Sequence, residues 1–163
     1  YAIDYDKLET TVKHAVHFLD NVIEVNQKGV FLVSQQVAKY MMGRRAGKII
    51  NICSMQSELG RKTITPYAAS KGAVKMLTRG MCVELAEYNI QVNGIAPGYF
   101  ATDMTAALVN DEAFSAWLYQ RTPAARWGKP EELIGAAVYL ASSAANFVNG
   151  HLLFVDGGML AAV

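Results

Sequence analysis

The chain has 163 residues, a length typical of one domain, and a formal net charge of +1. Hydrophobic residues make up 52% of it and charged residues only 18%, which favours elements buried on both faces. The near-zero charge gives no electrostatic argument for binding nucleic acid. The longest apolar stretch, residues 133–141, is too short to span a bilayer, and the N-terminus shows no basic and apolar secretory signal, so we expect no membrane association.

The cysteines and histidines predict neither a disulfide nor a metal site. Cys53 and Cys82 lie in apolar stretches, so we expect two buried thiols in a reducing, cytoplasmic protein. His14, His17 and His151 do not cluster with these cysteines, and no metal-ligand spacing occurs.

The N-terminal part of the chain has helical periodicity. Apolar positions recur at helical spacing over residues 6–25, and the same character continues to about Met41. We expect Gly43 and Gly47 to end this helix around a basic turn. Residues 48–53 are short and mostly apolar, which predicts a buried strand.

A second helix is predicted after the polar loop 54–65. Thr65 offers an N-cap and Pro66 suits the first helical position, so the helix should cover residues 67–88. A strand at 90–96 follows and is broken by a Pro-Gly pair.

The remaining elements complete an alternating order. Residues 99–127 form a long excursion, with the likeliest helix at 113–120, and such excursions are more often functional than idle. Pro130 followed by two glutamates should begin a helix that runs to about residue 143. A strand at 151–155 and a glycine turn close the chain. The order α-β-α-β-α-β predicts a parallel sheet of the α/β class.

Tyr67 and Lys71 carry the most informative chemistry. Four residues apart on a helix, they lie on one face, and an ammonium beside a phenol favours the phenolate. Such a phenol can exchange a proton with a substrate hydroxyl or carbonyl, and Ser54 at the end of a buried strand could bond the same oxygen. An exposed pair without a role is the alternative, because a chain with 8 tyrosines produces such a pair by chance.

Ordered motifs around this pair carry a resemblance to a known family. They are Val25-Asn26, Ile50-Asn51-Ile52-Cys53-Ser54, "YAASKGAV" from Tyr67, Val92-Asn93-Gly94-Ile95-Ala96-Pro97-Gly98, Thr102, "GKPEEL" from Gly128, and Val155-Asp156-Gly157-Gly158. From about Asp20 onward, the chain resembles the C-terminal part of a short-chain dehydrogenase/reductase. The resemblance implies a Rossmann-like, three-layer αβα domain with a parallel sheet. Within the family, it is similar to enzymes that act on sugar acids.

The resemblance also implies catalytic roles. Tyr67 would be the general acid/base, Lys71 would support it and hold the nicotinamide ribose, and Ser54 would orient the carbonyl. Asn26 would hold a water of the proton relay through its backbone. The local alternatives are that Asn26 bonds nearby backbone and that Ser54 only starts a loop.

The implied cofactor is NADP or NAD, with hydride transfer belonging to the cofactor's own chemistry. The implied cofactor-binding set is Tyr67, Lys71, Asn93, Pro97, Gly98 and Thr102. Two of these have structural alternatives, because Asn93 could satisfy backbone groups between strands and Thr102 could be a helix N-cap. Gly157-Gly158 is expected to form a turn rather than a ligand loop.

Substrate contacts are expected from the loop after Ser54 and from the excursion, which would form a lid. The candidates are Gln56, Arg61, Tyr99 and Arg126. An arginine fork suits the carboxylate of a sugar acid, so Arg61 or Arg126 is the candidate carboxylate contact. The alternative is that both arginines are surface salt-bridge partners.

Part of the family pattern has no counterpart in the chain. No glycine-rich turn for the pyrophosphate occurs, and residues 1–19 match none of the motifs. We therefore expect one partial domain that lacks the N-terminal cofactor-binding half, with residues 20–163 as its catalytic part. The strand at 48–53 would then present an unpaired edge. A fragment or incomplete copy, a truncated gene product and one half of a complementing pair all fit this pattern.

Two function hypotheses follow. The chain is either an oxidoreductase acting on a small sugar acid, or a non-catalytic remnant that keeps only the family's oligomerisation surfaces. The resemblance implies a homo-oligomer, dimer or tetramer. One contact would use the helix ending near Met42 and the helix at 67–88, and a second would use the helix from Glu131 and the last strand.

Overall fold

A computed structural model describes residues 15–163 of the chain. Its core is a parallel sheet of three strands in the order β1-β2-β3: β1 (Gly47–Ile52), β2 (Ile90–Pro97) and β3 (Leu152–Val155). The three strands predicted from the sequence are confirmed within one or two residues. The parallel α/β class is confirmed as well.

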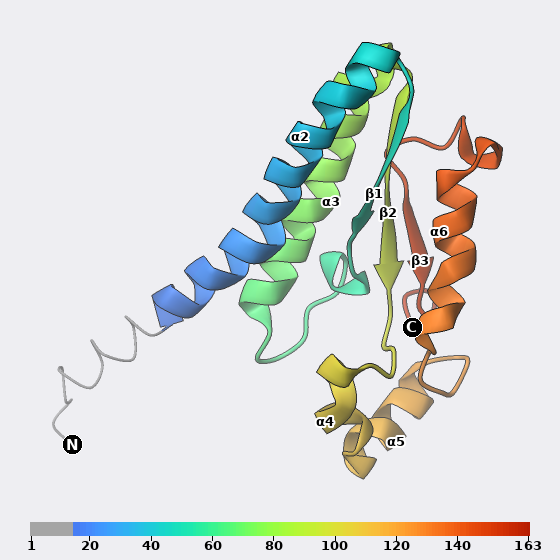
Figure 1. The fold of residues 1–163 in the computed structure, drawn as a ribbon. Helices are drawn as coiled ribbons and strands as arrows, with labels where there is room; N and C mark the ends of the chain where they lie inside the picture. Colours follow the sequence, from blue (N-terminus) through green and yellow to red (C-terminus); the bar gives the residue numbers. More distant parts are fainter. Residues whose placement is uncertain (1–14) are drawn as a thin grey trace, which may run out of the picture.

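Helices cover both faces of this sheet (Figure 1). The helices α2 (Gly29–Arg44) and α3 (Thr65–Leu85) lie on one side, and α6 (Ile134–Ala141) lies on the other. Because successive side chains of a strand point to opposite faces, the central strand β2 supplies both cores. Its Val92 packs with the α2 and α3 side, whereas Ile95 packs with Leu140 of α6. A strand buried on both faces explains the apolar composition.

The N-terminal helix differs in detail from its prediction. Residues 15–23 are α-helical, the π-helix η1 (Glu24–Lys28) follows, and α2 continues from it; the rest of the predicted helix, residues 6–14, lies outside the described residues. The helix ends between Gly43 and Gly47, in the basic turn expected there, although α2 runs through Gly43 itself to Arg44. The helix stops at Arg45, which adopts the left-handed conformation with φ 51°.

The start of α3 is also shifted from the prediction. Its N-cap position is Ile64 and no side chain caps it, so the predicted cap at Thr65 is wrong by one residue. Pro66 lies in the first turn, as expected, where its missing N–H has no helical partner to lose.

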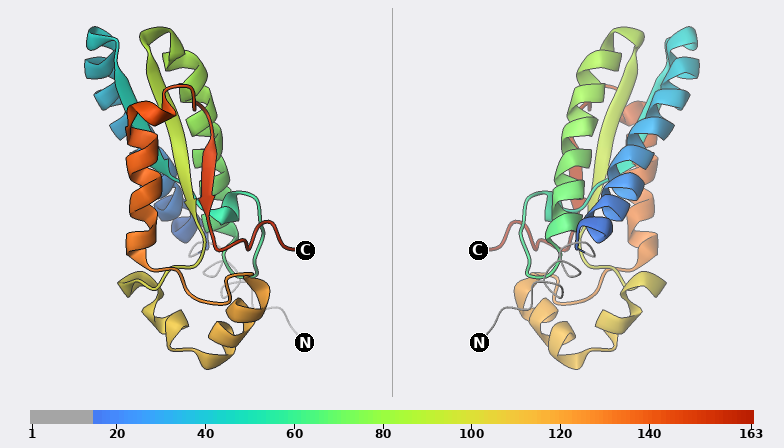
Figure 2. Two further views of the ribbon diagram at one scale, coloured as in Figure 1. Left: turned by 90° about the vertical axis from the view of Figure 1, so that its right-hand side faces the viewer. Right: turned by 90° about the vertical axis from the view of Figure 1, so that its left-hand side faces the viewer.

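The excursion forms a small helical layer beyond the carboxyl ends of the strands (Figures 1 and 2). It contains α4 (Ala106–Val109) and α5 (Glu112–Arg121), the latter close to the predicted helix at 113–120. The short 3-10 helices are Met55–Ser57, Ala86–Tyr88, Asp103–Thr105, Pro130–Leu133 and Ser143–Ala145. The helix predicted from Pro130 therefore begins as a 3-10 turn.

The outer edge of β1 has no partner strand within residues 15–163. Ile52 on this strand is 56% exposed, and Val33 on the neighbouring α2 is 65% exposed. An apolar strand edge of this kind is a template for pairing with another strand. The expected unpaired edge is thus present.

Among the described residues, no helix is both long enough and apolar enough to cross a membrane.

Candidate active site

Lys71 and Tyr67 lie together at the carboxyl end of β1. The Lys71 ammonium donates a hydrogen bond to the backbone oxygen of Ile52, over 2.9 Å, and lies 5.7 Å from the centre of the Tyr67 ring. Burial lowers the pKa of Lys71. The lysine is therefore held beside the phenol by the last residue of the strand.

Asn26 is tied to the same place by its side chain. Its Nδ2 donates to Ser70 Oγ over 3.2 Å, and Ser70 Oγ donates to the Tyr67 carbonyl over 2.7 Å. This reach across 44 residues replaces the local backbone bond considered as the alternative. Asn26 also lies inside η1, and π-helical turns are frequent at functional sites. Sequence reasoning missed Ser70, although it stands between Tyr67 and Lys71 in the "YAASK" motif.

Ser54 lies two residues after the end of β1 and is buried. Its Oγ accepts the backbone N–H of Gln56 over 3.1 Å, which caps the 3-10 turn Met55–Ser57. The loop-starting alternative thus describes its backbone role. The hydroxyl hydrogen has no acceptor within the described residues, so Ser54 can still donate to a substrate oxygen.

The chain leaves the carboxyl end of β2 at Pro97 and Gly98 and reaches Thr102 a few residues later. Gly98 N–H donates to the Val155 carbonyl over 2.9 Å, and a Cβ built on Gly98 would lie 2.7 Å from the Cα of Asp156. Thr102 stands at the N-cap of the turn Asp103–Thr105, where its N–H donates to Thr105 Oγ1 over 2.9 Å. Thr102 therefore has the capping role considered as its alternative.

Asn93 has a structural role in this fold. It lies in the middle of β2 and is 1% exposed, away from the carboxyl edge that holds Ser54 and Lys71. Its Nδ2 donates to the Val148 carbonyl over 2.7 Å, and its Oδ1 accepts the N–H of His151 over 3.0 Å. The side chain joins β2 to the loop before β3, which is the structural role considered as its alternative.

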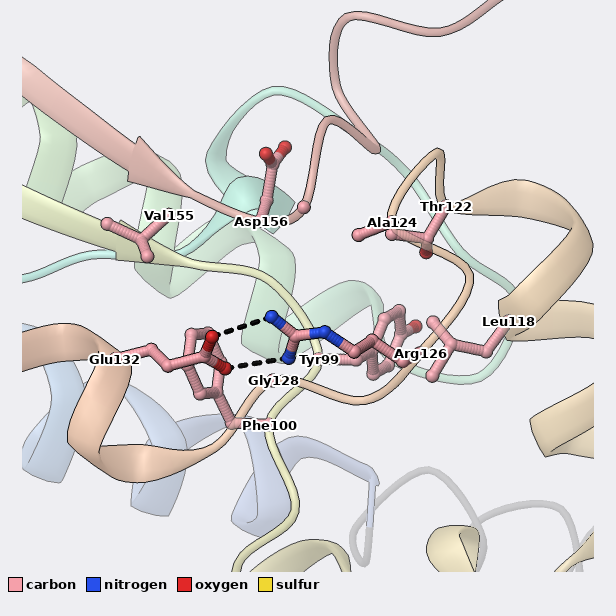
Figure 3. Close-up of a pocket in the computed structure, with 11 residues that line it drawn as sticks. Tyr99, Phe100, Leu118, Thr122, Ala124, Arg126, Gly128, Glu132, Val155 and Asp156 are labelled. Atoms are coloured by element: carbon pink, nitrogen blue, oxygen red, sulfur yellow. Dashed lines mark hydrogen bonds and ion pairs between the residues drawn. The ribbon is translucent and has the colours of Figure 1, made fainter.

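Three of the four substrate candidates line one hollow. Gln56, Arg61 and Tyr99 surround a space of about 130 Å³, and Arg61 Nη1 donates to the Tyr99 hydroxyl over 3.4 Å. Burial raises the pKa of Tyr99, and the nearby Arg61 opposes that rise. The fourth candidate, Arg126, lines a separate hollow of about 140 Å³, which Tyr99 also borders (Figure 3).

Arg126 is engaged by Glu132 in a two-point ion pair (Figure 3). Nη2 lies 2.6 Å from Oε1, and Nη1 lies 2.8 Å from Oε2. The surface salt bridge considered for Arg126 is what the structure shows, which leaves Arg61 as the better carboxylate candidate.

The ion pair predicts an acid-dependent step in stability. Hydrogen bonds from Arg126 and from the Lys129 backbone lower the pKa of Glu132 to about 2. Because the folded-state pKa is depressed, the stabilisation is complete above the ordinary carboxyl pKa and is lost as the pH falls toward about 2. A carbon-detected NMR titration should give the Glu132 midpoint near that value. Arg126→Gln should raise the midpoint toward the ordinary range, while the bond from the Lys129 backbone keeps part of the shift. An ordinary midpoint in the unaltered protein would contradict this pairing.

The described residues hold no cluster of three or more histidine, cysteine, aspartate or glutamate side chains suited to a metal. Cys53 and Cys82 are free thiols; Cys53 is buried as expected, whereas Cys82 is only partly buried.

The fold and the Tyr67, Lys71 and Ser54 arrangement define a class of protein: the chain belongs to the short-chain dehydrogenase/reductase family. A family model described as "Enoyl-(Acyl carrier protein) reductase" matches residues 5–160. This match begins at residue 5, whereas the motif resemblance described from the sequence begins at about Asp20.

Among its relatives, the chain is 78% identical over 144 residues to the 5-keto-D-gluconate 5-reductase of Escherichia coli (strain K12), covering 88% of this chain and 57% of that protein. It is 57% identical over 140 residues to the gluconate 5-dehydrogenase of Gluconobacter oxydans (strain 621H), covering 86% and 55%. A crystal structure of a gluconate 5-dehydrogenase from Burkholderia cenocepacia J2315, in complex with NADP and tartrate, superposes with a TM-score of 0.89 at 60% identity, covering 90% of this chain and 58% of that one. The chain thus spans little more than half the length of these relatives.

Proposed function

We propose that the protein is an NAD(P)-dependent oxidoreductase acting on a sugar acid, with D-gluconate and 5-keto-D-gluconate as the substrate pair. The observation that carries the proposal is the placement of Lys71, beside Tyr67 and bonded to the end of β1. The names of relatives 78% and 57% identical support the choice of substrate. In this proposal residues 20–163 are the catalytic part of the domain.

Tyr67 is the general acid/base on the reacting oxygen. A positioned phenol of this kind contributes to proton transfer only when it reaches the substrate oxygen, and the Lys71 ammonium lies 5.7 Å from the centre of its ring. Ser54 donates its free hydroxyl hydrogen to the same oxygen, which holds the carbonyl in place. Asn26, fixed through Ser70, holds a water of the proton relay by its backbone.

The residues present fit the nicotinamide end of NADP or NAD. The polar groups of Tyr67 and Lys71 lie at the carboxyl edge of the sheet, beside Pro97 and Gly98, which is where open α/β sheets bind their ligands. The solved relative in complex with NADP supports NADP as one cofactor. When bound, the nicotinamide supplies or accepts the hydride. The sequence holds no glycine-rich turn for the pyrophosphate, so these residues account for one end of the cofactor.

Homo-oligomerisation is part of the proposal. The helices α2 and α3 form a groove of about 200 Å³ lined by Phe31, Met42 and Met81 among others, and Phe31 is also substantially exposed. An apolar helix pair of this kind suits the same face of a second copy. The free thiols of Cys53 and Cys82 are compatible with the reducing cytoplasm. The same apolar groove favours the second candidate, an assembly-only protein without catalysis.

Cofactor binding separates the two candidates. The purified 163-residue protein should be titrated with NADPH and NADH while the nicotinamide fluorescence is followed, and reduction of 5-keto-D-gluconate should then be measured. Saturable binding and turnover are expected for the oxidoreductase. A folded protein that binds neither nucleotide would support the assembly-only candidate instead.

A further inference from the structure

One hollow near Ser54 has unused polar groups. We call it the Arg61 hollow; it has a volume of about 130 Å³ and is lined by Met55, Gln56, Leu59, Gly60, Arg61, Tyr99, Trp117, Arg121 and Met159. It begins next to the reacting centre, because the Gln56 backbone N–H is bonded to Ser54 Oγ over 3.1 Å.

Two buried polar atoms of this lining have no hydrogen-bond partner. They are Gln56 Oε1, on a residue that is 8% exposed, and Arg61 Nε. Both atoms are shielded from solvent as the side chains stand, and buried polar groups are nearly always bonded. An acceptor and a donor without partners on two residues of one lining therefore call for a ligand that supplies both partners once these side chains turn toward it. A hydroxy acid does so, because its hydroxyl can donate to Oε1 and its carboxylate can accept from Nε.

Arg61 is held in place for such a ligand. Its guanidinium carbon lies 5.6 Å from the centre of the Phe114 ring, and Nη1 donates to the Tyr99 hydroxyl. A guanidinium has five N–H donors in a rigid fork, and these contacts leave most of them open. The other arginine on the hollow, Arg121, is engaged with the Met159 carbonyl over 2.9 Å.

We infer that the Arg61 hollow is the subsite for the carboxylate end of a hydroxy acid, and that it binds this acid without the cofactor. Arg61 takes the carboxylate, and Gln56 Oε1 accepts a hydroxyl hydrogen of the same molecule. Every lining residue lies between Met55 and Met159, so this chain supplies the whole subsite, and we take binding without the cofactor as part of the inference. The subsite deepens the proposed function and rests on it for the identity of the reacting end.

Binding can be measured on the protein as it is, without nucleotide. Isothermal titration calorimetry with tartrate and with D-gluconate should give saturable binding, and Trp117 on the hollow should report it by fluorescence. D-Glucitol, which has hydroxyls but no carboxylate, should bind at least about ten-fold more weakly. Arg61→Gln should weaken acid binding by a similar factor, and Arg61→Lys should recover part of it, since lysine keeps the charge without the fork.

Arg79→Gln is the matched control, because Arg79 is exposed on α3 and lines neither hollow; it should leave acid affinity unchanged. Circular dichroism would verify that each variant is folded. Unchanged acid binding by folded Arg61→Gln, equal binding of D-glucitol, or no acid binding by the folded unaltered protein would each overturn the subsite. Failure of the proposed function gives a different result: hydroxy acids bind, but NADPH and NADH do not.

Discussion

Replacing Tyr67 with phenylalanine should lower kcat for reduction of 5-keto-D-gluconate by about 10²- to 10⁴-fold, the usual contribution of a positioned general acid. The substitution removes only the hydroxyl that would give its proton to the forming alkoxide. The Lys71 ammonium over the ring and its bond to Ile52 need no phenol oxygen. Initial rates with NADPH at saturating 5-keto-D-gluconate measure the effect.

The same substitution should leave stability nearly unchanged. The Tyr67 hydroxyl makes no hydrogen bond to the described part of the chain, whereas the Tyr67 carbonyl, which accepts from Ser70, is retained in the variant. Tyr40→Phe is the matched control: Tyr40 lies on α2, is 80% exposed, and should keep full activity. A Tyr67→Phe protein that turns over as fast as the unaltered one would remove Tyr67 from the reaction.

Much of this fold follows from short-range patterns in the sequence. The mostly apolar residues 48–53 predicted the right strand, because a strand buried on both faces needs mostly apolar side chains. The strands predicted at 90–96 and 151–155 are also confirmed. The spacing of Tyr67 and Lys71 likewise predicted that both side chains lie on one face of a helix. In the structure Lys71 lies beside the Tyr67 ring and bonds to the last residue of β1.

Other features depend on contacts that no local pattern contains. The π-helical turn around Asn26 leaves no propensity signal, and its side-chain partner Ser70 is 44 residues away. Asn93 was a candidate through the family resemblance and Arg126 through its residue type. Their observed partners are distant in sequence from the first and local for the second: the Val148 and His151 backbone bonds Asn93, and Glu132 pairs with Arg126. The start of α3 differs from its prediction for a similar reason. The residue at the N-cap position is Ile64 rather than Thr65, and the local sequence does not indicate this one-residue difference.

The free edge of β1 and the candidate active site are parts of one surface. An open hollow of about 420 Å³ runs along this edge and is lined by Val25, Asn26, Val33, Ile52 and Lys71 among others. Apolar side chains of α2 and two catalytic candidates therefore face the same space. A strand added beside β1 would cover the apolar part and close the site on that side.

Gly98→Ala should be the most destabilising single-methyl change at the site. The added Cβ would lie 2.7 Å from the Cα of Asp156 and 3.2 Å from its carbonyl oxygen. These are backbone atoms, held by the Gly98 N–H bond to Val155 and by the Asp156 carboxylate bonds to Gly158 and Leu160. Because a backbone cannot rotate away like a flexible side chain, we expect a loss of about 1–3 kcal/mol in the free energy of unfolding.

Gly80→Ala is the matched control, since its Cβ would meet nothing within 4 Å in the middle of α3. Alanine is the better helix former by about 1 kcal/mol, so this change should stabilise the protein. Urea unfolding followed by circular dichroism therefore should move the two midpoints in opposite directions. If Gly98→Ala unfolds at the same urea concentration as the unaltered protein, the close approach between the ends of β2 and β3 is not rigid, and the sheet edge that carries the site can adjust to added volume.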